Sequence, residues 1–155
     1  LVSSQAGCVE QVNKLVHVRP SKKRYIGEVG DIVVGRVVDV GSKTWKLDVQ
    51  GHKNAILHLS SINLPGGEQR KKSYSDQLQM RLFFEEGDLL SAEVQSIQND
   101  GCTSLHTRSL KFGKLTNGQL YVAPASLVGR LKQHSVSLPC GVDLILGNNG
   151  YIWIT

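Results

Sequence analysis

The sequence is short of the features that mark disulfide-rich, zinc-binding or membrane-spanning proteins. Its 155 residues include only three cysteines, Cys8, Cys102 and Cys140, and no two of them form a C-x-x-C pair. This spacing gives no disulfide framework and no zinc motif, and it indicates free thiols in a reducing compartment. No apolar run is long enough to span a bilayer and no secretory signal is visible, so we expect no membrane partner. The first residue is Leu1, not Met, and the last residues form a strand-like run. We therefore expect this sequence to be truncated at both ends relative to the natural protein.

Motifs that carry catalysis are also missing. The aspartates fall at turns or strand edges without a paired-acid motif for metal-dependent phosphodiester chemistry. The five histidines have no metal-ligand spacing, and no Gly-x-x-x-x-Gly-Lys phosphate loop occurs. We therefore expect no enzyme activity, no catalytic residues, no metal site and no cofactor.

Negative charge is scarce relative to positive charge. The sequence has 18 Lys and Arg residues against 13 Asp and Glu residues, a formal net charge of +5. Such a surplus suggests a polyanionic partner, of which nucleic acid is the commonest. A basic surface that serves only solubility is the alternative, and charge alone does not separate the two.

Helical patterning is rare, and short Val, Ile and Leu runs between turn residues predict a mainly β fold. We expect two short strands within residues 8–18 and a boundary in the basic connector that follows. One helix is expected over residues 74–86, because Leu78 and Leu82 would share one face. Five further strands are expected at residues 31–40, 44–49, 55–59, 89–97 and 103–107. Three strands, a connection with a helix and then two strands is the layout of a five-stranded OB barrel.

The last third of the chain has a different pattern and predicts a second, smaller α+β unit. We expect a strand at residues 119–122, a helix at 124–132 and two strands at 142–146 and 151–154. The final two strands flank the tetrapeptide Gly147-Asn148-Asn149-Gly150.

Several segments resemble a known RNA-binding family. Residues 30–37 (GDIVVGRV), 56–60 (ILHLS) and 87–94 (GDLLSAEV) resemble the first, third and fourth strands of an S1-type OB domain. Residues 138–141 (LPCG) and 146–153 (LGNNGYIW) look like the divergent KH domain of RNA exosome cap subunits. The whole chain resembles the cap subunits of the ribosomal-RNA-processing-four type, and residues 63–67 (NLPGG) and 105–110 (LHTRSL) favour this type over its paralogue.

The resemblance implies three parts: an N-terminal β segment at 1–24 from a truncated small β domain, an S1-type OB domain at 25–110, and a C-terminally truncated KH-like domain at 111–155. It implies a non-catalytic subunit on a ring of RNase-PH-like subunits beside other cap subunits. There it would stabilise the ring and guide RNA into the channel for 3′–5′ decay and ribosomal RNA processing, in the nucleus, nucleolus and cytoplasm.

Two other functions remain possible on the residues. One is the RNA-binding tail of a phosphorolytic exoribonuclease, although that enzyme has its KH domain before its OB domain. The other is a translation-type RNA-binding protein without ring partners.

Strand alternation and the resemblance together select candidate RNA-binding residues. Trp45 should face the barrel core with Leu47 and Val49, and base stacking is the less favoured role for it. Typical S1-type domains carry exposed aromatics where this chain has Lys43 and Lys46, so phosphate contact should replace stacking and binding of single-stranded RNA should have little sequence preference. The predicted RNA-binding set is Arg36, Lys43, Lys46, His58 and Arg108. Each could also be an ordinary surface residue.

Two more segments each have two possible roles. The run Arg70, Lys71 and Lys72 is either a solvated loop or a contact to RNA or a partner. Gly147, Asn148, Asn149 and Gly150 match the Gly-x-x-Gly pattern with which KH domains clamp RNA. Their flanks are strand-like and no Lys or Arg is present, so we predict a structural hairpin with Tyr151 or Trp153 packed on the OB domain. The tetrapeptide suits a tight turn because Asn and Gly tolerate positive φ.

Overall fold

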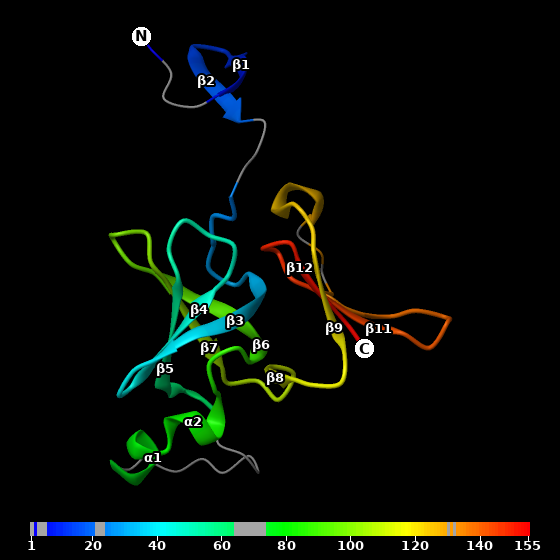
Figure 1. Cartoon of the computed structure of the whole chain (residues 1–155). Helices are drawn as coiled ribbons and strands as arrows, with labels where there is room; N and C mark the ends of the chain where they lie inside the picture. Colours follow the sequence, from blue (N-terminus) through cyan, green and yellow to red (C-terminus); the bar gives the residue numbers. More distant parts are fainter. Residues whose placement is uncertain (1, 3–5, 21–23, 64–73, 130, 132) are drawn as a thin grey trace.

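A computed structural model describes residues 2, 6–20, 24–63, 74–129, 131 and 133–155. The described chain forms three antiparallel or mixed sheets of two, six and four strands, with very little helix (Figure 1). The mainly β prediction is confirmed. None of the helices in these ranges is long and apolar enough to cross a membrane.

The central sheet closes into a five-stranded barrel. Its strands are β3 (Ile32–Val40), β4 (Thr44–Asp48), β5 (Ala55–Ile62), β6 (Leu89–Ile97) and β7 (Thr103–Thr107). They pair in the order β3-β4-β5-β7-β6, and β3 also pairs with β6, which closes the barrel. The β5–β7 pair is parallel and the others are antiparallel. A short strand that the sequence pattern did not indicate, β8 (Gly113–Leu115), extends this sheet beyond β6.

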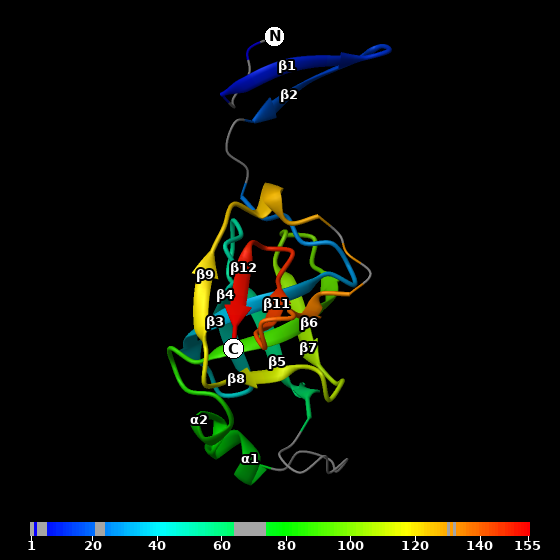
Figure 2. The same cartoon turned by 90° about the vertical axis from the view of Figure 1, so that its right-hand side faces the viewer.

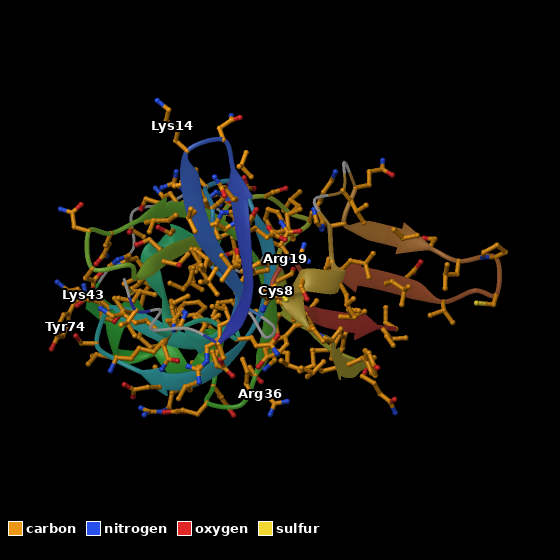
Figure 3. All side chains as sticks on the ribbon, turned by 90° about the horizontal axis from the view of Figure 1, so that it is seen from above. Cys8, Lys14, Arg19, Arg36, Lys43 and Tyr74 are labelled. Atoms are coloured by element: carbon orange, nitrogen blue, oxygen red, sulfur yellow. The ribbon has the colours of Figure 1, made fainter. Side chains whose placement is uncertain are left out.

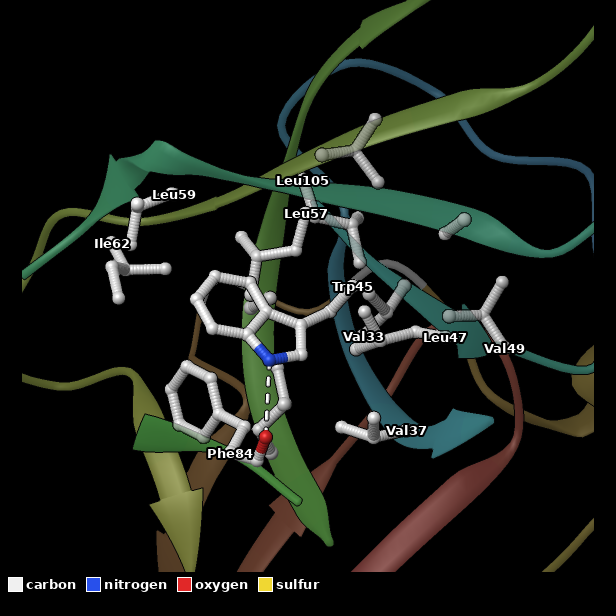
Figure 4. Close-up of a cluster of buried hydrophobic side chains, with 14 of the residues drawn as sticks. Val33, Val37, Trp45, Leu47, Val49, Leu57, Leu59, Ile62, Phe84 and Leu105 are labelled. Carbon is white, nitrogen blue, oxygen red and sulfur yellow. Dashed lines mark hydrogen bonds between the residues drawn. The ribbon is translucent and has the colours of Figure 1, made fainter. Parts of the chain in front are cut away.

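Trp45 lies at the centre of the barrel core (Figure 4). Its side chain is fully buried, and its Nε1–H donates a hydrogen bond to the backbone oxygen of Phe84 at 3.1 Å. The Trp45 and Phe84 rings meet edge to face with their centroids 5.3 Å apart. The buried partner for the indole N–H makes this a stable core position, and the prediction that Trp45 faces the core is confirmed.

The expected single helix over residues 74–86 is wrong in its length and in its buried face. The structure has two short helices, α1 (Tyr74–Leu78) and α2 (Met80–Phe83), separated at Gln79. The Gln79 N–H bonds to the Asp76 oxygen and the Leu82 N–H to the Gln79 oxygen, three residues back in each case. These tighter turns rotate the chain, so that an i, i+4 pair no longer marks the inner face. Leu78 and Leu82 are accordingly exposed, while Met80 is buried.

The C-terminal unit is a four-stranded antiparallel sheet in the order β10-β11-β12-β9. Its strands are β9 (Gln119–Val122), β10 (Ser135–Ser137), β11 (Asp143–Leu146) and β12 (Tyr151–Ile154). β10 is only three residues long, too short for sequence alternation to indicate. The expected helix over 124–132 is wrong: the chain makes one 3₁₀ turn, η1 (Ala125–Leu127), and Val128 after it is extended. Gly129 follows, and glycine disfavours continuing a helix.

The N-terminal strands form a hairpin of their own, as the sequence pattern predicts. β1 (Gly7–Val12) and β2 (Leu15–Pro20) pair around Asn13, whose φ of 56° suits a tight turn. The hairpin stands apart from the barrel (Figure 2). Its apolar side chains, Val9 and Leu15 among them, are largely exposed. An isolated two-stranded hairpin is marginally stable in water.

Candidate nucleic-acid interface

The outward face of β3, β4 and β5 carries a group of cationic side chains. Along β4, Trp45 and Leu47 point into the barrel, so Thr44 and Lys46 point outward. The register places Thr44 opposite His58 of β5, and Lys46 opposite Asp39 of β3. Lys46 and His58 therefore share one exposed face of the barrel.

Lys46 is not a free cation. Its Nζ donates to Asp39 Oδ2 at 2.9 Å, and this hydrogen bond lowers the pKa of the Asp39 carboxyl. The contact arises because a register shift between Val37 and Asp39 turns the aspartate toward β4. Sequence alternation alone could not show this. An exposed ion pair contributes little to stability, so a phosphate can replace the Asp39 carboxylate.

Lys43 lies in the turn between β3 and β4 and forms no ion pair with any other residue that the structure describes. Its backbone oxygen accepts a hydrogen bond from the Leu59 N–H at 2.9 Å, which fixes the turn beside β5. The Lys43 side chain is exposed, and so is His58, one residue before Leu59. Lys43, Lys46 and His58 are thus brought together on adjoining strands.

Arg36 and Arg108 lie at the margins of this face. Arg36 is paired across the sheet with Asp48, whose Oδ2 accepts a hydrogen bond from the Tyr151 hydroxyl at 2.9 Å, so Arg36 borders the C-terminal unit. Arg108 follows β7, where its backbone oxygen accepts a hydrogen bond from the Asn63 side chain. Figure 3 shows Arg36 and Lys43 well separated across the molecule. Arg70, Lys71 and Lys72 lie outside the described residues.

Tyr74 is a candidate that the sequence reasoning missed. It opens α1 two residues after the end of the basic run 70–72, and its side chain is 72% exposed. In Figure 3 it lies on the same side of the barrel as Lys43. An exposed aromatic next to a basic run is a pattern that favours single-stranded nucleic acid, because bases stack on such rings. That pattern was available in the sequence.

The Gly147-Asn148-Asn149-Gly150 tetrapeptide forms a β-hairpin turn between β11 and β12. The Gly150 N–H bonds to the Gly147 oxygen at 2.9 Å, and within the tetrapeptide positive φ is confined to Gly150, at 86°. The turn therefore uses the tolerance of glycine for positive φ and not that of asparagine. The last residue of this hairpin loop, Gly150, is in the left-handed region of backbone conformation, as is common in hairpin loops.

Asn149 explains why an asparagine stands in this turn. Its side chain is fully buried; Nδ2 donates to the oxygens of Val34 at 2.7 Å and Val49 at 3.1 Å, and Oδ1 accepts from the Val34 N–H at 3.3 Å. β4 pairs with β3 only from Arg36 onward, so the edge of β3 at Val34 is uncovered by β4. The asparagine amide occupies that edge in place of a strand.

Aromatic side chains of β12 complete the contact between the two units. Tyr151 and Trp153 pack against Val34 of β3 in a cluster separate from the barrel core. Burial, and next the Asp48 hydrogen bond, raise the pKa of Tyr151 to about 12. The predicted packing of the hairpin on the OB barrel is therefore observed. Among the described residues, no group of three or more His, Cys, Asp and Glu side chains is placed to hold a metal ion.

Two family models match the chain over these two units. The model described as "RRP4, S1 domain" matches residues 24–96, and the model described as "KH domain" matches residues 118–155. The exosome complex component RRP4 of Mus musculus is 57% identical over 154 residues, and that of Saccharomyces cerevisiae is 57% identical over 152 residues. The chain belongs to the RRP4 family. These alignments cover 99% and 98% of the chain, but 53% and 42% of the two relatives.

More distant members of the RRP4 family match over the same length. The exosome complex component Rrp4 of Thermococcus kodakarensis is 29% identical over 163 residues, covering the whole chain and 61% of that relative. A crystal structure provisionally described as an exosome complex RNA-binding protein superposes with a TM-score of 0.62 over 85% of this chain and 75% of its own. It is 18% identical, so it shows the likeness of fold. The chain spans about half the length of the curated relatives it matches.

Proposed function

We propose that this chain is a non-catalytic RNA-binding cap subunit of the RNA exosome. The observation that carries the proposal is the match to exosome components over nearly the whole chain, 57% identical to the mouse protein. The order of units supports it too, because the S1-type barrel precedes the KH-like unit, the reverse of the order in a phosphorolytic exoribonuclease tail. Within the cap, the chain would stabilise a ring of RNase-PH-like subunits and guide RNA into its channel for decay and ribosomal RNA processing, in nucleus, nucleolus and cytoplasm.

RNA would bind on the outward face of β3–β5. Lys43 and Lys46 would contact its phosphates, and His58 of β5 would contact the strand beside them. Arg36 and Arg108 would extend the contact at the two margins. Lysine contacts to phosphate carry no base information, so the preference among single-stranded sequences should be weak. In this proposal the chain is divided into an N-terminal segment at 1–24, an OB domain at 25–110 and a KH-like domain at 111–155.

The hairpin Gly147, Asn148, Asn149 and Gly150 would serve structure rather than RNA binding. Its buried asparagine already uses both side-chain polar atoms on the barrel backbone. Mobile RNA phosphates would have to compete with those hydrogen bonds.

Copurification tests the assembly. The tagged chain, expressed in eukaryotic cells, should co-elute with ring subunits, and a variant with Lys43→Gln and Lys46→Gln should co-elute equally well while binding less RNA. A translation-type RNA-binding protein would instead bind RNA without ring subunits. Absence of ring subunits from a folded, RNA-binding sample would refute the exosome assignment.

A further inference from the structure

A cavity of about 440 Å³ lies between the barrel and the C-terminal sheet. Its walls include Ser91 of β6, the connector residues Lys111 and Phe112, and Gln133 and His134 just before β10. The volume falls within the usual range of small-molecule sites, roughly 300–1,000 Å³. Ile32 at the start of β3 also lines the cavity, but Lys43, Lys46 and His58 do not.

One wall carries a hydroxyl without a partner. Ser91 is 1% exposed, and no described residue forms a hydrogen bond with its Oγ. A buried hydroxyl without a partner is unfavourable, so such groups in native proteins often mark a site that a ligand or water completes. Because Ser91 lines the cavity, a ligand inside it would lie beside this hydroxyl.

His134 lines the same space in a fixed orientation. It is buried, and its Nδ1 lies 2.6 Å from the backbone oxygen of Leu146. A carbonyl can only accept, so Nδ1 carries the hydrogen and the neutral ring keeps Nε2 as an acceptor. The His134 Nε2 acceptor and the Ser91 hydroxyl line one small cavity. They suit a heterocyclic ligand that has both hydrogen-bond donors and acceptors along its edge.

The remaining walls supply an aromatic ring and a cation. Phe112 is half-buried and meets His106 edge to face, with ring centroids 6.5 Å apart, which holds the phenyl ring in place. Lys111 is exposed and forms no ion pair with any residue in the described part of the chain. Arg108 lies three residues earlier on the same connector, so an RNA strand at that margin of the barrel can reach the mouth of the cavity.

We propose that this cavity binds one nucleotide of the RNA strand. The base enters against Phe112 with its edge toward Ser91 and His134, and Lys111 contacts the adjoining phosphate. Such a pocket would add base preference to a surface that otherwise contacts phosphates. The proposal rests on the RNA-binding function proposed above, but it concerns different residues.

Nucleoside monophosphates probe the site directly. The complete 155-residue chain, isotopically labelled, is titrated with AMP and with UMP at millimolar concentration, and inorganic phosphate is the control. We expect amide shifts in residues 111–112 and 133–135 with the nucleotides and not with phosphate. Phe112→Leu, which keeps apolar volume, should weaken binding at least about fivefold, the lower end of aromatic stacking.

Matched variants separate the site from general effects. Tyr121→Leu removes an exposed aromatic from β9, and it should bind like the unaltered chain. Ser135→Trp fills the cavity from an exposed rim position, and it decides the question if Phe112→Leu does not fold. The proposal is overturned if neither nucleotide shifts these amides, if phosphate shifts them equally, or if folded Ser135→Trp binds as well as the unaltered chain. The variant with Lys43→Gln and Lys46→Gln tests the barrel face instead: it should bind RNA more weakly but bind AMP and UMP like the unaltered chain.

Discussion

Replacing Asn149 with leucine should weaken the attachment of the C-terminal unit to the barrel. Leucine has the same branched skeleton as asparagine but no polar atoms, so the change removes the hydrogen bonds; its methyl groups are larger than the amide, and any overpacking adds to the loss. Three backbone groups each lose a partner: the Val34 N–H, the Val34 oxygen and the Val49 oxygen. All three lie in a buried environment, since Val34 and Asn149 are fully buried.

The expected size follows from the count of bonds. A buried hydrogen bond contributes a net of about 1 kcal/mol, and leaving the partner unsatisfied costs about 1–3 kcal/mol. Three bonds at the lower value give a loss of about 3 kcal/mol. For a chain of this length each kcal/mol lowers Tm by about 2–4 °C, so we expect a fall of about 6–12 °C.

Thermal unfolding followed by circular dichroism measures the change. Asn148→Ala is the matched control, because the Asn148 Oδ1 has no partner among the described residues and its backbone N–H still bonds to the Ile32 oxygen. The control should lose no more than about 1 kcal/mol. RNA affinity of folded Asn149→Leu should barely change. A Tm within about 2 °C of the unaltered chain, or loss of RNA binding at unchanged Tm, would refute a structural role for this asparagine.

Three further predictions follow from the same structure. Gly150→Val should lower Tm more than Asn148→Ala, because φ at Gly150 is 86° and a Cβ there would collide with the Ala123 oxygen; equal melting temperatures would contradict this. Tyr151, whose pKa is raised to about 12 from an ordinary value of 10.0, favours its neutral form when folded, so its contribution to the unfolding free energy is complete below pH 10.0 and is lost as pH rises toward 12. Tyr151→Phe should flatten that part of the stability curve in denaturant titrations at several pH values, and an unchanged slope would count against it. The purified chain should not shorten a labelled RNA with magnesium or phosphate present, and time-dependent shortening by a contaminant-free sample would disprove that.

The barrel could be predicted from the sequence because strand alternation is strong there. Trp45, Leu47 and Val49 alternate with polar residues, and each of the three is buried as expected. The hairpin around residues 147–150 was predictable for the same reason, since its flanks read as strands. Short elements were missed, because three residues such as Gly113–Leu115 carry no periodicity.

The site was less predictable, because its charges depend on tertiary pairing. Asp39 forms an ion pair with Lys46 only because of a register shift in β3, which the sequence pattern does not indicate. The role of Asn149 depends on an uncovered stretch of β3 more than a hundred residues earlier in the chain, which turn propensity cannot show. The helix prediction failed because two residues at i, i+4 cannot show that the helix is interrupted at Gln79.

RNA affinity as a function of salt concentration tests the central claim most directly. The comparison is between the unaltered chain, the double variant Lys43→Gln with Lys46→Gln, and a charge-matched control, Lys14→Gln with Lys53→Gln. Each phosphate contact to a single strand contributes about 0.7 to the slope of log affinity against log salt. If the outward face of β3–β5 binds RNA, the first variant should bind more weakly with a slope shallower by about 1.4, and the control should change less. Unchanged affinity and slope in the first variant, or an equal loss in the control, would contradict RNA binding at this face.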